Sequence, residues 1–295
     1  MLFRSELFVD ATPDLDTCHQ GPLGDCYFVV AVGAYVHRNP EDLKQRITRL
    51  PDGQLHVAFG DGRASTFAPL TDAELALSGT TGDEGLWLPV MEKALGSLRH
   101  DTDPDRFTTE TATDAIAKGG SSATILRLLT GHQTKRIVLR KRAPKAPTGP
   151  DGKPVLQPAP ALAQDAESLA TLVRTEVGAA LAAKRLVTCG TGTYAQPPGI
   201  SPRHAYAVLA HDATADTLTL WNPHGNTFVP KGAPGIERGY PTKAGVFTLP
   251  IAEFVQIFGA VVCETDAPAP KPTAPKKATS QPTATPTAPA NSSGK

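Results

Sequence analysis

The chain has 295 residues, with 29 basic and 29 acidic side chains, so its formal net charge at pH 7 is zero. A neutral chain has no basic excess with which to attract nucleic acid, and no apolar run approaches the ~20 residues that a membrane-spanning helix requires. The length is sufficient for one or two hydrophobic cores.

The first half of the chain is predicted to be mainly helical. An almost uninterrupted apolar run over residues 27–36 predicts a buried central helix. Gly21 and Gly24 suit a tight turn before this helix, which should end ahead of Pro40 because proline disfavours helical conformation in the residue before it. A small hairpin is predicted over residues 55–67.

The second half is predicted to be rich in β-structure. Strands are expected at residues 136–139, 186–189 and 260–263. A proline-rich stretch at 143–163 predicts a surface loop, and apolar residues recurring at helical spacing predict an amphipathic helix over 165–184.

A second hairpin follows in this half of the chain. Residues 204–210 predict a strand, a polar turn covers 212–216, and 217–221 predict the returning strand. A hairpin of this kind can place His204 and Asn222 near the same end of a sheet.

Four polar residues around these elements have the chemistry of nucleophilic catalysis. Cys26 opens the buried helix, where the helix N-terminus and an imidazole would lower the pKa of its thiol. His204 can act as the base, and the Asn222 oxygen can hold its ring. Gln20 lies close enough to point its amide at the same carbonyl. Singly, each residue type is more often structural, but their combination favours a Cys–His–Asn site.

The sequence motifs around these residues resemble those of the calpain family of cysteine proteases. QGPLGDCYF at 20–28 is similar to the calpain signature QGxxGDCWF, and HAYAVL at 204–209 and NPHG at 222–225 resemble GHAYSV and NPWG. Further stretches match in the same order: LWLPVMEKA at 86–94, the glycine pair at 119–120 with LTG at 129–131, and GVFTLP at 245–250 followed by Glu253, Phe254 and Phe258.

This resemblance implies an α+β, papain-like two-lobed cysteine protease fold. A helical lobe over 1–133 would carry the nucleophile helix, and an antiparallel β-sheet lobe over 134–265 would carry the histidine and asparagine. Residues 266–295, rich in proline, threonine and alanine, are expected to form a disordered tail.

The resemblance also implies roles for individual residues. Cys26 would be the nucleophile, His204 the acid and base, Asn222 the orienter of His204, and Gln20 an oxyanion-hole donor. Asp25, Tyr27 and His224 would lie near the site. The implied activity is that of an intracellular cysteine endopeptidase acting on a protein or peptide substrate.

Two positions depart from the calpain pattern. Tyr27 and His224 stand where calpains have tryptophan. The second of these tryptophans shields the catalytic hydrogen bond in calpains and holds their lobes apart without calcium. A histidine there would shield less and would add a titrating group.

No cofactor or metal is expected. Calcium follows from the resemblance, but residues 226–232 after the NPHG segment contain no carboxylate, and Glu237 is the first acid beyond them. The four cysteines form no CxxC pair that would indicate zinc.

No nucleic-acid or membrane partner is expected either. The basic stretch at 135–145 lacks interleaved aromatic residues, so it predicts a solvated strand end and loop. Residues 1–6 lack the apolar stretch of a secretion signal, and a free thiol without a disulfide pattern suits the reducing cytoplasm. The tail could mediate a protein interaction, be processed or only solubilise.

Two other functions stay open beside the endopeptidase. A thiol acyltransferase of the transglutaminase kind would use the same Cys–His chemistry with an amine as acceptor, although the QGPLGDC word argues against it. A catalytically weak or inactive calpain-like binding module would explain His224 and the missing acidic loop.

Overall fold

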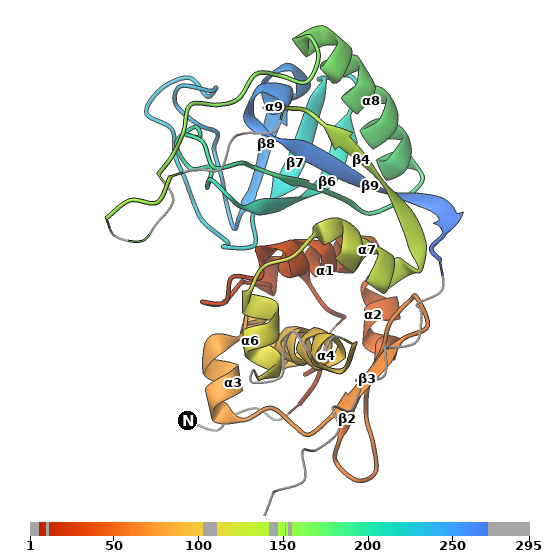
Figure 1. The fold of residues 1–295 in the computed structure, drawn as a ribbon. Coiled ribbons are helices and arrows are strands. Elements are labelled where there is room, and N and C mark those ends of the chain that lie inside the picture. Colours follow the sequence, from red (N-terminus) through yellow and green to blue (C-terminus); the bar gives the residue numbers. More distant parts are fainter. Residues whose placement is uncertain are drawn as a thin grey trace, which may run out of the picture.

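A computed structural model describes residues 6–9, 12–102, 111–141, 147–150, 152 and 155–270. The α+β class predicted from the sequence is confirmed within these ranges. Helices dominate the first part and a six-stranded sheet dominates the second (Figure 1). None of the described helices is long and apolar enough to cross a membrane.

The first part consists of these elements: η1 (Leu15–Thr17), α1 (Cys26–Arg38), α2 (Pro40–Arg46), β1 (Ile47–Arg49), β2 (Leu55–Ala58), β3 (Ala64–Phe67), α3 (Asp72–Leu77), η2 (Gly82–Glu84), α4 (Trp87–Thr102), α6 (Ala112–Ala117) and α7 (Ser122–Thr130). The second part consists of β4 (His132–Val138), α8 (Ala166–Ala182), β5 (Val187–Gly190), β6 (Ala205–Asp212), β7 (Thr217–Trp221), β8 (Val246–Pro250), α9 (Ile251–Ile257) and β9 (Ala260–Pro268).

Helix α1 is buried along most of its length. Residues 27–36 are all buried, as the apolar run predicted. The helix ends at Arg38, and the Asn39 side chain then caps α2, which begins with Pro40. Gly33 lets α1 approach the sheet closely, because a Cβ there would lie 2.4 Å from the Trp221 ring.

The large sheet has the strand order β4-β9-β5-β6-β7-β8, and every neighbouring pair is antiparallel. Side chains alternate between its two faces, as the two-residue period of a strand requires. Ala207 packs into the core around α1, whereas Tyr206 and Val208 pack into a second core with α8 and α9. The sheet therefore lies between α1 and α7 on one side and α8 and α9 on the other (Figure 1).

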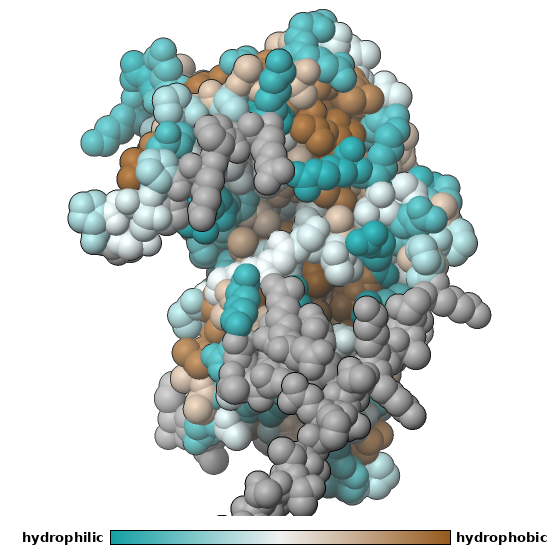
Figure 2. Space-filling view, viewed as in Figure 1, coloured by the Kyte–Doolittle hydropathy of each residue, from teal (hydrophilic) through white to brown (hydrophobic). Residues whose placement is uncertain are grey.

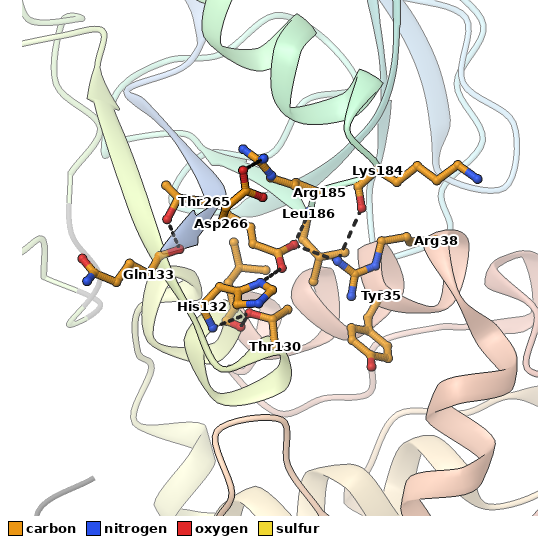
Figure 3. Close-up of polar contacts among 12 residues, drawn as sticks. Tyr35, Arg38, Thr130, His132, Gln133, Lys184, Arg185, Leu186, Thr265 and Asp266 are labelled. Carbon is orange, nitrogen blue, oxygen red and sulfur yellow. Dashed lines mark hydrogen bonds and ion pairs between the residues drawn. The ribbon is translucent and has the colours of Figure 1, made fainter. Parts of the chain in front are cut away.

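A buried carboxylate ties α1 to the sheet. Glu264 of β9 accepts hydrogen bonds from Arg38 Nη1 at 2.8 Å and from the Leu186 backbone N–H at 2.8 Å, and its other oxygen lies 2.7 Å from His132 Nδ1. These partners come from the end of α1, the start of β4 and the residue before β5, and they converge on one point (Figure 3). The contact fixes the C-terminal end of α1, so the N-terminal end with Cys26 is held in register with the sheet.

The local predictions agree with this fold in most places. The hairpin at 55–67 is β2 and β3, the helix at 165–184 is α8, and the hairpin at 204–221 is β6 and β7. Strand β1, which pairs with β2, was not predicted. The described residues of the proline-rich loop contain no helix or strand.

The predicted start of the tail differs from the structure. Strand β9 continues past residue 265 to Pro268, and the Ala269 N–H donates to Gly131 O at 2.7 Å. Backbone pairing with β4 extends the strand where composition alone indicated disorder. Residues 1–5, 142–146 and 271–295, which include most of the predicted tail, lie outside the described residues.

Candidate active site

A cavity of about 520 Å³ lies between the start of α1 and the large sheet. Cys26, the first residue of α1, and His204, the residue before β6, both line it. In the space-filling view the surface is indented between the sheet and the helices below it (Figure 2). Two residues that are 178 positions apart in the sequence (204 − 26) thus face one cavity.

The turn before Cys26 is packed tightly against other elements. A Cβ at Gly21 would lie 2.2 Å from Ser78 O, and one at Gly24 would lie 2.9 Å from Ala117 O. Neither position leaves room for a side chain. The two glycines therefore bring the backbone close to α3 and α6, and this fixes where α1 begins.

The Cys26 thiol is half-buried beside the first residue of β6. Burial raises the pKa of this thiol, and a backbone hydrogen bond from Ala205 partly opposes that effect. Ala205 directly follows His204, so this contact places the sulfur next to the histidine segment. At neutral pH the resting thiol is protonated, because its ordinary pKa of 9.0 is raised further, so the lowering expected from the helix N-terminus and an imidazole is wrong for this buried thiol.

A chain of hydrogen bonds fixes the proton on His204. The His224 backbone N–H can only donate, and it lies 3.0 Å from Asn222 Oδ1, so this oxygen is an acceptor. His204 Nε2 lies 2.8 Å from the same oxygen and must donate to it. Asn222 Nδ2 donates to Asn226 Oδ1 at 2.8 Å, and Asn226 Nδ2 lies 3.4 Å from Gly199 O. His204 therefore carries its proton on Nε2, which leaves Nδ1 free to accept one.

The imidazole of His204 is buried and stacked. Its ring centroid lies 4.1 Å from that of His224 at an interplanar angle of 28°, and Tyr206 meets it edge-on at 5.1 Å. Burial, together with a smaller effect of charge on His224, lowers the pKa of His204 to about 4, although the hydrogen bond to Asn222 opposes both effects. His204 is thus neutral at pH 7, and the stacked His224 ring covers one face of its imidazole.

Gln20 lies at the site, but its side-chain amide is hydrogen-bonded within the protein and does not point at a position that a substrate carbonyl could occupy. Its backbone N–H donates to Pro223 O at 2.8 Å, which joins the nucleophile turn to the NPHG segment. Its Nε2 donates to Leu23 O at 2.7 Å and to Asp25 Oδ1 at 3.2 Å, so both amide protons have acceptors. A role in an oxyanion hole stays a prediction that requires the amide to release one of them.

Asp25 forms a buried carboxyl pair that the sequence did not indicate. Burial raises the pKa of Asp25 to about 6, and burial together with the Asp25 charge raises the pKa of Glu92 well above its ordinary value. The Gly79 N–H donates to Glu92 at 2.9 Å. The two carboxyl groups therefore titrate as a pair, and the burial of Glu92 favours its protonated form. The only feature of the sequence that could have indicated Glu92 is its position in the LWLPVMEKA motif.

The remaining predicted neighbour, Tyr27, also lines the cavity. Its hydroxyl donates to Ile116 O at 3.0 Å, and the Arg99 guanidinium lies over its ring at 5.0 Å. Tyr27 therefore packs the start of α1 against α6. The described residues contain no group of three or more side chains that could hold a metal ion.

Comparison with known proteins adds no assignment, since no family model matches the chain and no curated protein matches it significantly.

Proposed function

We propose that the chain is a cysteine endopeptidase with a papain-like two-lobed fold of the calpain type. The observation that supports this most strongly is the fixed tautomer of His204, which leaves Nδ1 without a proton in a residue that lines the same cavity as Cys26. Proton abstraction from a thiol requires a neutral imidazole, and here one ring nitrogen is held by a hydrogen bond while the other can accept the proton.

The proposed reaction begins with a neutral thiol and a neutral imidazole. Cys26 Sγ transfers its proton to His204 Nδ1 and attacks the substrate carbonyl carbon, forming a C–S bond. The Cys26 backbone N–H at the start of α1 would donate to the developing oxyanion, joined by Gln20 once its amide leaves the Leu23 carbonyl. The imidazolium then protonates the leaving amine as the C–N bond breaks.

Hydrolysis of the acyl-enzyme reverses these roles. His204 removes a proton from water, the resulting hydroxide adds to the thioester carbon, and the thiol leaves with the proton. Asn222 accepts from Nε2–H throughout and favours the imidazolium when it forms. The products are a carboxylic acid and an amine, so an amine acceptor in place of water would reveal an acyltransferase instead.

A binding module without activity is the second candidate, and two observations favour it. The pKa of the Cys26 thiol is raised and that of His204 is lowered, which disfavours proton transfer between them, and both amide protons of Gln20 have acceptors. A site in this state would need substrate or a partner to complete it.

Covalent labelling separates the two candidates. Full-length protein is treated with a peptide-like epoxide that alkylates activated thiols, and the modified cysteine is located by mass spectrometry. Fast labelling confined to Cys26 and lost in His204→Ala would support the protease. Slow labelling of all four cysteines at similar rates would refute it in favour of the binding module. Cys26→Ser serves as the blank.

We also propose that activity does not require calcium, because residues 226–232 offer no carboxylate. Labelling and peptide cleavage should be equal in calcium and in chelator. A cooperative gain of activity during a calcium titration would contradict this.

A further inference from the structure

The charges around the candidate site are one-sided. Four of the residues that line its cavity are cations, and no aspartate or glutamate is among them: Arg136, Arg140, Lys141 and Arg203. The formal charge of the whole chain is zero, so the cavity is a local basic region on a neutral protein.

None of these four cations forms an ion pair with a carboxylate in the described part of the chain. Elsewhere in the same ranges arginines commonly do, as Arg38 does with Glu264 and Arg174 with Asp216. The positive charge around the cavity is therefore not neutralised internally by the described residues. Cations beside a partly enclosed cavity attract anions more strongly than isolated surface charges do.

Arg140 is held in a fixed position. Its guanidinium donates to Pro160 O at 2.6 Å and to Gln256 O, and it lies over the Tyr194 ring at 5.2 Å. Its Nε–H is buried and has no acceptor among the described residues. The two carbonyls and the Tyr194 ring therefore fix the guanidinium in the cavity wall, where its charge acts on any anion bound in the cavity.

Arg136 and Arg203 enter the cavity wall from different segments. Arg136 belongs to β4, whereas Arg203 directly precedes His204. Arg203 has a φ of 51°, and its backbone N–H donates to Gly192 O at 2.9 Å. Both side chains are exposed, so they can contact a ligand without disturbing the core.

We propose that this cavity binds acidic side chains of the substrate, so that the preferred peptide carries aspartate or glutamate close to the scissile bond. This inference rests on the proposed protease function and adds the substrate class. It also gives the basic residues 136–141 a role, where the sequence indicated only a solvated strand end.

The test compares matched peptides. Cleavage sites in a mixed peptide library are first mapped by mass spectrometry, and the preferred acidic position is then made as glutamate and as its neutral isostere glutamine. We expect kcat/KM for the glutamate peptide to be about tenfold higher or more, as a charge-assisted hydrogen bond in a partly enclosed site provides. This preference should weaken as ionic strength rises.

Single variants then assign the preference to residues. Arg136→Gln and Arg203→Gln should each lower the Glu/Gln ratio by roughly threefold to tenfold, and the Arg→Lys variants should keep more of it. Lys44→Gln on α2, which removes one charge away from the cavity, should leave the ratio unchanged. Circular dichroism and thermal midpoints show whether each variant is folded.

Two readouts keep this inference separate from the proposed chemistry. Equal cleavage of the glutamate and glutamine peptides, with Cys26 still alkylated by neutral iodoacetamide in a His204-dependent manner, would overturn the acidic preference and leave the protease standing. Binding of both peptides to the Cys26→Ser variant is measured in parallel. If wild type cleaves nothing in the library, the glutamate and glutamine forms of a library peptide retained by Cys26→Ser are compared instead, and tenfold tighter binding of the glutamate form would support the cavity's selectivity and refute the protease.

Discussion

Replacing Asn222 with alanine would remove the group that holds His204. The side chain is 2% exposed and takes part in three hydrogen bonds, with His204 Nε2, the His224 N–H and Asn226 Oδ1. At about 1 kcal/mol of net stabilisation for each bond, the variant should lose about 3 kcal/mol of unfolding free energy. Alkylation of Cys26 should slow by about tenfold or more, because the imidazole is no longer oriented.

Asn222→Asp is the matched variant, since it keeps both acceptor contacts and adds a negative charge beside the ring. An opposite charge at hydrogen-bond distance raises the pKa of a histidine by roughly 1 to 3 units. The pKa of His204, about 4 in the wild type, should therefore rise by that amount and approach the neutral range. The aspartate cannot donate to Asn226, so the Asn222→Asp variant loses one hydrogen bond. Its free energy of unfolding should therefore fall by ~1 kcal/mol.

Urea unfolding gives the stability of both variants, provided the m-value stays constant. The pH dependence of Cys26 alkylation, or an NMR titration of His204, gives the pKa. An alanine variant that is as stable as wild type and is alkylated at the same rate would refute the orienting role of Asn222. An aspartate variant whose pH profile does not move upward would refute the contact with His204.

Three further predictions concern the buried charges. Because the pKa of His204 falls from 6.5 to about 4 on folding, the folded state takes up this proton later than the unfolded chain as pH decreases. Stability is thus lost between pH 6.5 and 4, and the unfolding free energy of His204→Gln should gain about 3 kcal/mol relative to wild type between pH 7 and 4; equal pH dependence would contradict this. Glu92→Gln should cost under ~1 kcal/mol, since burial favours the neutral form of this carboxyl, whereas Glu92→Ala leaves Asp25 and the Gly79 N–H without their partner and should cost ~2–4 kcal/mol; similar losses for the two variants in urea unfolding would contradict a neutral Glu92. Glu264→Ala should cost about 3 kcal/mol and Glu264→Gln less, because the half-buried Arg38 loses its partner; a thermal midpoint unchanged in the alanine variant would show that the junction in Figure 3 contributes nothing.

Much of the fold follows from short-range pattern. The apolar run at 27–36 specifies a buried helix because apolar residues fill every face. Two short strand-like segments at 204–210 and 217–221, joined by a polar turn, specify a hairpin. The pairing of His204 with Asn222 follows from that hairpin, since antiparallel strands bring their two ends together. These features depend on neighbours in the chain, so the amino-acid sequence alone determined them.

Contacts between distant segments were decided only by tertiary packing. The Glu92 carboxyl meets Asp25 across 67 positions, and Glu264 gathers partners from three separate elements. Asn226 extends the hydrogen-bond chain to the site, and the cations of β4 and the His204 loop meet around one cavity. The periodicity of the sequence does not predict such long-range contacts, because they depend on how the sheet packs against α1. The protonation states of Asp25 and His204 likewise follow from burial, which exists only in the folded chain.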